Sequence, residues 1–171
     1  MIRRSAAFLL SCAVSSLLLV GACLRAEAST EYSKHFGALS QLSVAVAEAM
    51  PAEKYGFKPH PESMTFAELM SHIASTNYQF CAGLKDVDPP TLPSPTEKTT
   101  VVKFLGDSFQ YCMGIIENLT EAQLSTLHNS PDGRMPGREV LLAMYIHVAH
   151  HRGQAEIYLR DNGIKPPAYR I

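Results

Sequence analysis

Four stretches of the chain share one pattern, and this pattern limits the fold more than any other feature of the sequence. In each stretch, apolar or small residues recur at steps of three and four, which places them on one face of an α-helix. The stretches cover residues 31–50, from 63 or 65 to about 83, from 96 or 99 to about 119, and 138–161. Alternation typical of strands is almost absent. The sequence therefore predicts an all-α fold, a four-helix bundle.

The connections between these stretches differ in length and stiffness. The segment "KDVDPPTLPSPTEK" over residues 85–98 contains four prolines, too many for a tight turn between antiparallel neighbours. We expect it to cross over along the bundle, so that helices two and three point the same way. Thr120 caps a short helical piece to about Leu127, and "HNSPDGRMPG" is predicted to be a loop.

The first 28 residues are typical of an export signal. Arg3 and Arg4 precede an apolar run, and Ala26 to Ala28 form a small-residue cleavage site before Ser29. Residues 29–171 are then the mature bundle domain, periplasmic or secreted. A second interpretation is a loose lipobox in which a lipid on Cys23 would anchor the protein to a membrane.

Charge excludes one class of partner. Cleavage after Ala28 leaves 12 Lys and Arg against 15 Asp and Glu, a net charge of −3. With this balance of charges the mature chain is not basic enough for a nucleic-acid-binding protein. A homodimer through an outer helix face is compatible with a bundle, but the sequence carries no clear mark of one.

Two cysteines remain after cleavage, Cys81 and Cys112, on the second and third predicted helices. In an exported protein they could form a disulfide bond, provided that their Cα atoms lie within about 7 Å. The alternative is two small buried side chains with free thiols. The sequence leaves both open.

Histidines on the inward face of the fourth helix are the strongest functional signal. His147 and His151 are one turn apart on a seam, that is, a row of residues at steps of three and four along the inward face of the helix. Two such imidazoles can bind one divalent ion if a third ligand comes from elsewhere, which leaves a position for water or substrate. His72, on a similar seam of the second helix, is the best candidate. The alternative is a set of hydrogen-bonded core histidines without metal.

The other histidines give weaker signals. His150 lies off the inward seam of the fourth helix, and His35 is expected at the boundary of the first helix. His60, between two prolines, and His128, in the predicted loop, are expected to face solvent.

Three further polar residues are candidates for supporting the site. Glu68, one turn before His72, could orient that imidazole, or it could be a first-turn acid favoured by the helix dipole. Arg152 could hold an anionic substrate or pair with Glu156 one turn on. Gln154 continues the inward seam and is expected near the site.

With these residues placed, the chain resembles the DinB-like superfamily of metal-binding four-helix bundles. The stretches that carry the resemblance are "AEKYGFKPHPESMTFAELMSHIA" (52–74) and "HVAHHRGQAEIYLRDNGIKPP" (147–167). The second stretch is the more specific, because it joins HxxxH to an RGQ extension. The resemblance implies metal ligation by His72, His147 and His151.

The resemblance says less about the reaction. Characterised relatives include transferases and isomerases that use low-molecular-weight thiols such as mycothiol or bacillithiol, but an export signal places this chain where such thiols are scarce. The expectation is a metal-dependent enzyme, a hydrolase or a thiol S-transferase, acting on a small molecule. The metal is expected to be zinc, with nickel or iron as alternatives. The competing hypothesis is a non-catalytic exported bundle in which the metal is structural or a small ligand is bound.

Overall fold

The computed structural model describes residues 30–169. The predicted export signal and the alternative at Cys23 lie outside these residues. Four long helices form the bundle: one over residues 30–49, α2 (Phe66–Leu84), α3 (Lys98–Ile116) and α5 (Gly137–Asp161). The short elements are η1 (Ala52–Lys54), α4 (Glu121–Ser125), β1 (Leu127–His128) and β2 (Met135–Pro136). The predicted all-α four-helix bundle is confirmed.

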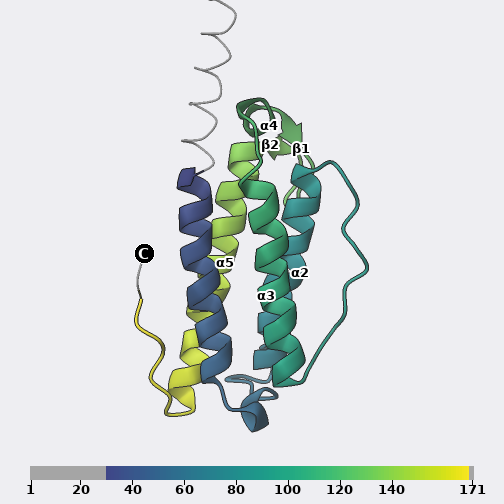
Figure 1. Cartoon of the computed structure of the whole chain (residues 1–171). Helices are drawn as coiled ribbons and strands as arrows, with labels where there is room; N and C mark the ends of the chain where they lie inside the picture. Colours follow the sequence, from purple (N-terminus) through teal and green to yellow (C-terminus); the bar gives the residue numbers. More distant parts are fainter. Residues whose placement is uncertain (1–29, 170–171) are drawn as a thin grey trace, which may run out of the picture.

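Helix directions follow from the long connection between α2 and α3. In Figure 1 the helix over 30–49 runs in the same direction as α5, whereas α2 and α3 both run the opposite way. Residues 85–97 return along the outside of the bundle to reach the start of α3 (Figure 1). The hydroxyl of Ser71 on α2 donates a hydrogen bond to the carbonyl of Pro95 at 3.2 Å, which fastens this crossover to the bundle. The predicted crossover is confirmed.

Two helices begin with reciprocal caps that the local sequence encodes. The Thr65 hydroxyl accepts from the backbone N–H of Glu68, and the Glu68 carboxylate accepts from the backbone N–H of Thr65. Thr120 and Gln123 form the same arrangement at the start of α4. Each box satisfies N–H groups that a helix start would otherwise leave unpaired.

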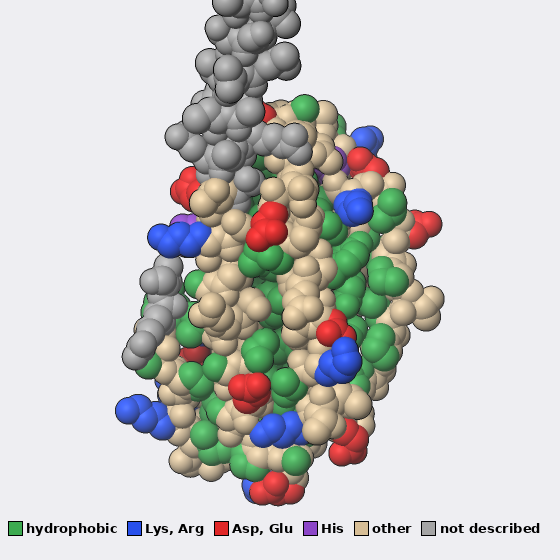
Figure 2. Space-filling model, in the orientation of Figure 1, with side chains coloured by type: hydrophobic (Ala, Val, Ile, Leu, Met, Phe, Trp, Pro, Cys, Tyr) green, Lys and Arg blue, Asp and Glu red, His purple; other side chains and the backbone are tan. Residues whose placement is uncertain are grey.

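Apolar faces of all four helices meet in one core. Its largest fully buried side chains come from every long helix and from Met50, which directly follows the first: Phe36, Met50, Phe66, Phe80, Met70, Ile73, Leu84, Leu105, Ile116, Leu141, Met144 and Leu159. No helix within residues 30–169 is long and apolar enough to span a membrane. On the face drawn in Figure 2, acidic and basic side chains are interspersed, with no large patch of either sign.

A disulfide bond joins the two parallel helices. It links Cys81 of α2 to Cys112 of α3, whose Cα atoms are 5.5 Å apart, and both residues are fully buried. The Cys81 sulfur also lies 3.6 Å from the Met144 sulfur of α5. The bond therefore sits in the core, where three helices meet.

The segment predicted as a loop after α4 is more ordered than its composition suggests. Leu127 and His128 pair with Met135 and Pro136 as a two-residue antiparallel ladder. The hairpin packs closely on the end of α2, where a Cβ on Gly83 would overlap the carbonyl oxygen of Asn129. Only glycine allows this approach, so the end of α2 and the hairpin fit together.

The expectation that His128 faces solvent is wrong. The residue is buried, its Nε2 lies 2.8 Å from the carbonyl oxygen of Gln123, and its Nδ1 lies 3.2 Å from a carboxylate oxygen of Asp86. Asp86 adopts a left-handed backbone conformation (φ 54°) just after α2. His128 thus connects the hairpin to the end of α2, a tertiary role that loop composition does not reveal.

Candidate metal centre

Three histidines converge where α2 packs against α5. One ring nitrogen from each of His72, His147 and His151 can be chosen so that all three atoms lie within 4.8 Å of one another. The Nε2 atoms of His72 and His147 are 3.0 Å apart, and the three ring centroids are 4.4–4.9 Å apart. Among residues 30–169 this is the one group of three or more His, Cys, Asp or Glu side chains gathered in this way.

Buried neighbours on both helices fix the positions of these imidazoles. Leu69 and Ile73 flank His72 on the core side of α2, and Met144 and Val148 do the same for His147 on α5. Because these apolar residues must face the core, the histidines next to them or one turn away are carried to the contact between the two helices. The sequence seams therefore predicted the convergence.

Burial keeps the three imidazoles in the neutral form that binds metals. It lowers the pKa of His147 to about 4, with smaller contributions from the neighbouring His151, His72 and His150. Burial also lowers the pKa of His72, and so does the nearby His151. For His151, burial lowers the pKa, and the hydrogen bond with Gln154 opposes the shift only in part. Neutral imidazole is the state that offers a lone pair to a cation.

Gln154 determines which nitrogen of His151 is free. The Gln154 Oε1 atom lies 2.7 Å from His151 Nδ1, and an amide oxygen can only accept, so Nδ1 carries the proton. The lone pair of His151 is then on Nε2. Such a hydrogen bond on the far side of the ring is the usual support of a metal-binding histidine. Gln154 thus lies where the sequence seam places it.

The donor set fits a divalent ion. Three neutral imidazoles are the protein part of a four-coordinate site with one open position. Two nitrogens bound at about 2.05 Å in a tetrahedral shell would be about 3.3 Å apart, close to the 3.0 Å between His72 and His147. The second nitrogen of His147, Nδ1, is buried without a hydrogen-bond partner among the described residues.

Comparisons with known proteins identify the family of the chain. The family model described as the DinB superfamily matches residues 35–155. The chain belongs to the DinB superfamily. Protein YjoA of Bacillus subtilis (strain 168) is 27% identical over 140 residues, which cover 79% of this chain and 91% of YjoA.

Solved structures show the same fold. The crystal structure of YjoA, described as a DinB-like protein, matches with a TM-score of 0.71 and 25% identity, over 82% of this chain and 98% of that one. A DinB-like protein from Bacillus cereus ATCC 10987 also has a TM-score of 0.71, at 17% identity, over 81% of this chain and 95% of its own. The superfamily fold therefore extends over most of the described residues.

Two of the predicted supporting residues of this DinB-superfamily chain direct their charged groups to partners other than the three histidines. The Glu68 carboxylate accepts hydrogen bonds from Thr65, which lower its pKa, with a smaller contribution from Lys58. Glu68 thus acts at the start of α2, which was the alternative to orienting His72. Arg152 forms an ion pair with Glu156, and its guanidinium lies 5.5 Å from the centre of the Tyr169 ring. This pair is largely buried, not exposed as expected for a surface pair.

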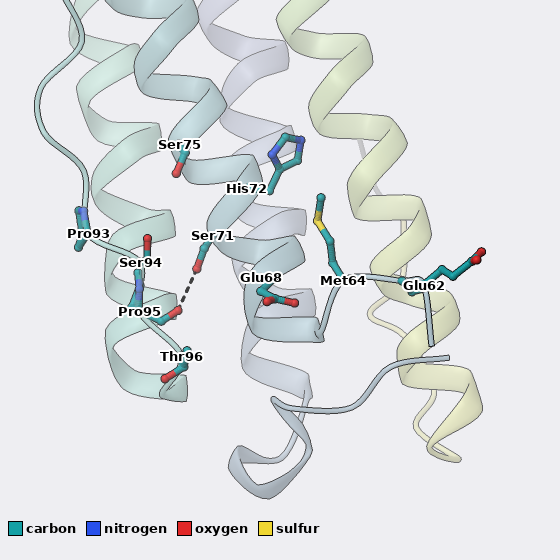
Figure 3. Close-up of a pocket in the computed structure, with 11 residues that line it drawn as sticks. Glu62, Met64, Glu68, Ser71, His72, Ser75, Pro93, Ser94, Pro95 and Thr96 are labelled. Carbon is teal, nitrogen blue, oxygen red and sulfur yellow. Dashed lines mark hydrogen bonds between the residues drawn. The ribbon is translucent and has the colours of Figure 1, made fainter. Parts of the chain in front are cut away.

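Two clefts open beside the histidines. The first, of about 560 Å³, lies between α2 and the crossover and is lined by His72, Met64 and hydroxyl-bearing residues that include Ser71, Ser75 and Ser94. Figure 3 shows the Met64 side chain extending toward His72. The second cleft, of about 450 Å³, lies against α5 and is lined by His151 and Gln154. Small molecules therefore have two approaches to the centre.

The segment just before α2 separates the clefts, and sequence reasoning missed its role. Glu62, Ser63 and Met64 line both. The Tyr158 hydroxyl of α5 donates a hydrogen bond to the carbonyl of Met64 at 2.9 Å, which holds the segment in place. Tyr158 continues the seam of His147 and His151, so its position on the same face was an available signal. The role of residues 62–64 depends on tertiary packing and has no such signal.

Proposed function

We propose that this DinB-superfamily chain is an exported metal-dependent enzyme that activates water to hydrolyse a small molecule. The observation that carries the proposal is the convergence of three neutral imidazoles, from His72, His147 and His151, between two open clefts. A metal that only ties helices together has no need of clefts on either side, whereas a catalytic ion needs an approach for its substrate.

The side chains of the centre have distinct roles in this proposal. His72 from α2 and His147 and His151 from α5 hold the ion, and Gln154 keeps the lone pair of His151 on Nε2. We propose zinc, because three histidines with an open position form a known catalytic zinc set; nickel and iron accept the same ligands. When bound, such an ion supplies Lewis acidity and lowers the pKa of water or a thiol in its open position.

The chemistry of the clefts favours water over a low-molecular-weight thiol. The charged side chains that line them are Glu62 and Glu68, and neither cleft is lined by Lys or Arg. Thiol cofactors that carry carboxylates would find no cationic partner there. The hydroxyls of Ser71 and Ser75 instead offer hydrogen bonds to a neutral polar substrate. Transfer to a thiol is the runner-up reaction.

Two observations support export. Residues 1–28 have the charge pattern, apolar run and cleavage site of a secretion signal, and Cys81 and Cys112 form a buried disulfide bond. Disulfides persist mainly in oxidising compartments, where free low-molecular-weight thiols are scarce. Mass spectrometry of the protein purified from its native host tests this proposal: a mature N-terminus at Ser29 is expected, whereas an intact Met1 would contradict export, and a lipid on Cys23 would indicate anchoring.

Cobalt substitution tests the catalytic proposal. Cobalt in place of zinc gives a visible spectrum that depends on every ligand, so added azide should change the spectrum if one position is exchangeable. The same titration on the His35→Ala variant should match the wild type, because His35 is exposed on the first helix and does not belong to the three-histidine group. A spectrum that azide leaves unchanged would indicate a closed, structural site and contradict the proposal. A response to thiols but not to azide would favour the transferase.

A further inference from the structure

The outer face of α5 has no partner within the described residues. Leu142, Ile146 and Ile157 are 60%, 60% and 50% exposed on the side of α5 opposite the core. We propose that this face binds a second copy of the same chain, with the two α5 helices antiparallel. This inference does not depend on the proposed hydrolase activity.

The exposed apolar residues lie on one stripe. Glu139, Leu142, Ile146, Ala149, Gly153, Ile157 and Arg160 follow one another at steps of three and four, the spacing of a helix–helix seam. From Leu142 to Ile157 the stripe extends for about 22 Å at 1.5 Å per residue. Scattered single apolar residues on a surface need no explanation, but a seam of this length is typical of a helix that packs against another.

The stripe on one copy of α5 is complementary to the same stripe on a second, antiparallel copy. With a two-fold axis between positions 149 and 150, each residue faces the one equally far on the other side of the axis. Leu142 then faces Ile157 of the second copy, and Ile146 faces Gly153. A Cβ on Gly153 would meet nothing within 4 Å, so the space outside this residue is open. The side chain of Ile146 can fill it and let the helices approach closely.

Charges at the two ends of α5 select the antiparallel direction. The same pairing places Glu139 opposite Arg160 of the second copy, and Arg138, which already forms an ion pair with Glu121 of its own chain, opposite Asp161. Glu139 is exposed and has no ion-pair partner among residues 30–169, and Arg160 is half exposed, with its guanidinium 3.6 Å from Glu156. A parallel pair would place like charges together at both ends. Charge complementarity at the two ends of α5 therefore favours an antiparallel second copy over a parallel one.

The dimer would also border the second cleft. Ile157, which would contact Leu142 of the second copy, lines the cleft that contains His151 and Gln154. The second copy would therefore form part of the rim of this approach to the histidines.

Sedimentation equilibrium of the mature chain, compared with single variants, tests the proposal. We expect a dimer for the wild type and a monomer for Ile146→Asp, which places a charge at the middle of the seam. Leu127→Asp is the matched control, because Leu127 is 54% exposed on β1 and is not one of the stripe residues, and this variant should remain dimeric. Circular dichroism establishes that each variant is folded.

A charge exchange tests the direction of the helices. Glu139→Arg and Arg160→Glu should each weaken dimerisation about tenfold, because the two-fold axis repeats each contact and converts two attractions into repulsions. The double variant restores opposite charges and should recover most of the affinity. A monomeric wild type, a dimer that tolerates Ile146→Asp or dissociates with Leu127→Asp, or a double variant no tighter than the singles would overturn the proposal.

Discussion

Two substitutions of Gln154, with opposite expected effects on metal affinity, test whether its hydrogen bond to His151 supports metal binding. In Gln154→Ala, His151 loses the acceptor 2.7 Å from its Nδ1, so its proton is free to occupy either ring nitrogen. In Gln154→Glu, a carboxylate takes the place of the amide, so the hydrogen bond becomes charge-assisted. The first change should weaken zinc binding and the second should strengthen it.

The expected sizes follow from this one hydrogen bond. A neutral hydrogen bond contributes about 0.5–1.5 kcal/mol, which corresponds to about a two- to twelvefold change in a binding constant. Because the Gln154 side chain is exposed, water can replace it in part, so we expect about a fivefold loss for Gln154→Ala. Charge-assisted bonds are about twice as strong, which adds a second increment of the same size, so Gln154→Glu should bind zinc about fivefold more tightly than the wild type.

Competition with a chromophoric zinc chelator at neutral pH measures both constants. Gln110→Ala, which removes an exposed glutamine of α3, is the matched control and should bind zinc like the wild type. If both Gln154 variants bound zinc with wild-type affinity, or if both weakened it equally, the role assigned to this hydrogen bond would be refuted.

Three further predictions concern stability. Reducing the Cys81–Cys112 bond, which closes a loop with a sequence separation of 31, should lower the free energy of unfolding by about 3–4 kcal/mol; equal urea midpoints for the oxidised and reduced protein would refute this. In the metal-free protein, His147 has a pKa of about 4 when folded and about 6.5 when unfolded, so the unfolded state binds its proton first as pH falls. The contribution of His147 to the free energy of unfolding should therefore be complete above pH 6.5 and should fall by about 1–2 kcal/mol toward pH 4, after allowance for the partial exposure of the ring. The His147→Gln variant should show a smaller fall of the unfolding free energy with pH, and a fall equal to that of the wild type would contradict the reasoning. His128→Ala should cost about 2–3 kcal/mol, because it removes buried hydrogen bonds to Asp86 and to the backbone; a urea midpoint equal to that of the wild type would show that His128 is not structural.

Local patterns were enough to predict the helices and the three convergent histidines. The steps of three and four that place Leu69 and Ile73 in the core also carry His72 to the α2–α5 contact, and the same argument holds for His147 and His151. Periodicity works here because each helix has a single apolar face, which leaves little freedom in how it packs.

What the sequence could not settle depends on contacts between distant segments. Glu68 was compatible with two roles because Thr65 and His72 are both within one turn of it, and only the geometry of the capping box distinguishes them. His128 reads as a loop residue because its partner Asp86 is 42 residues away. The clefts were also unforeseeable, since the segment that separates them is positioned by Tyr158 from the far end of the chain.

Metal content is the most direct measurement of the central claim. The wild-type protein, loaded with zinc and then dialysed, should retain about one zinc per chain. The His35→Ala variant should retain as much, because it removes an exposed imidazole of the first helix that does not belong to the three-histidine group. His72→Ala should lose the metal while circular dichroism shows an intact bundle. A wild-type protein that retains no metal, or a His72→Ala variant that retains as much as the wild type, would contradict the three-histidine centre.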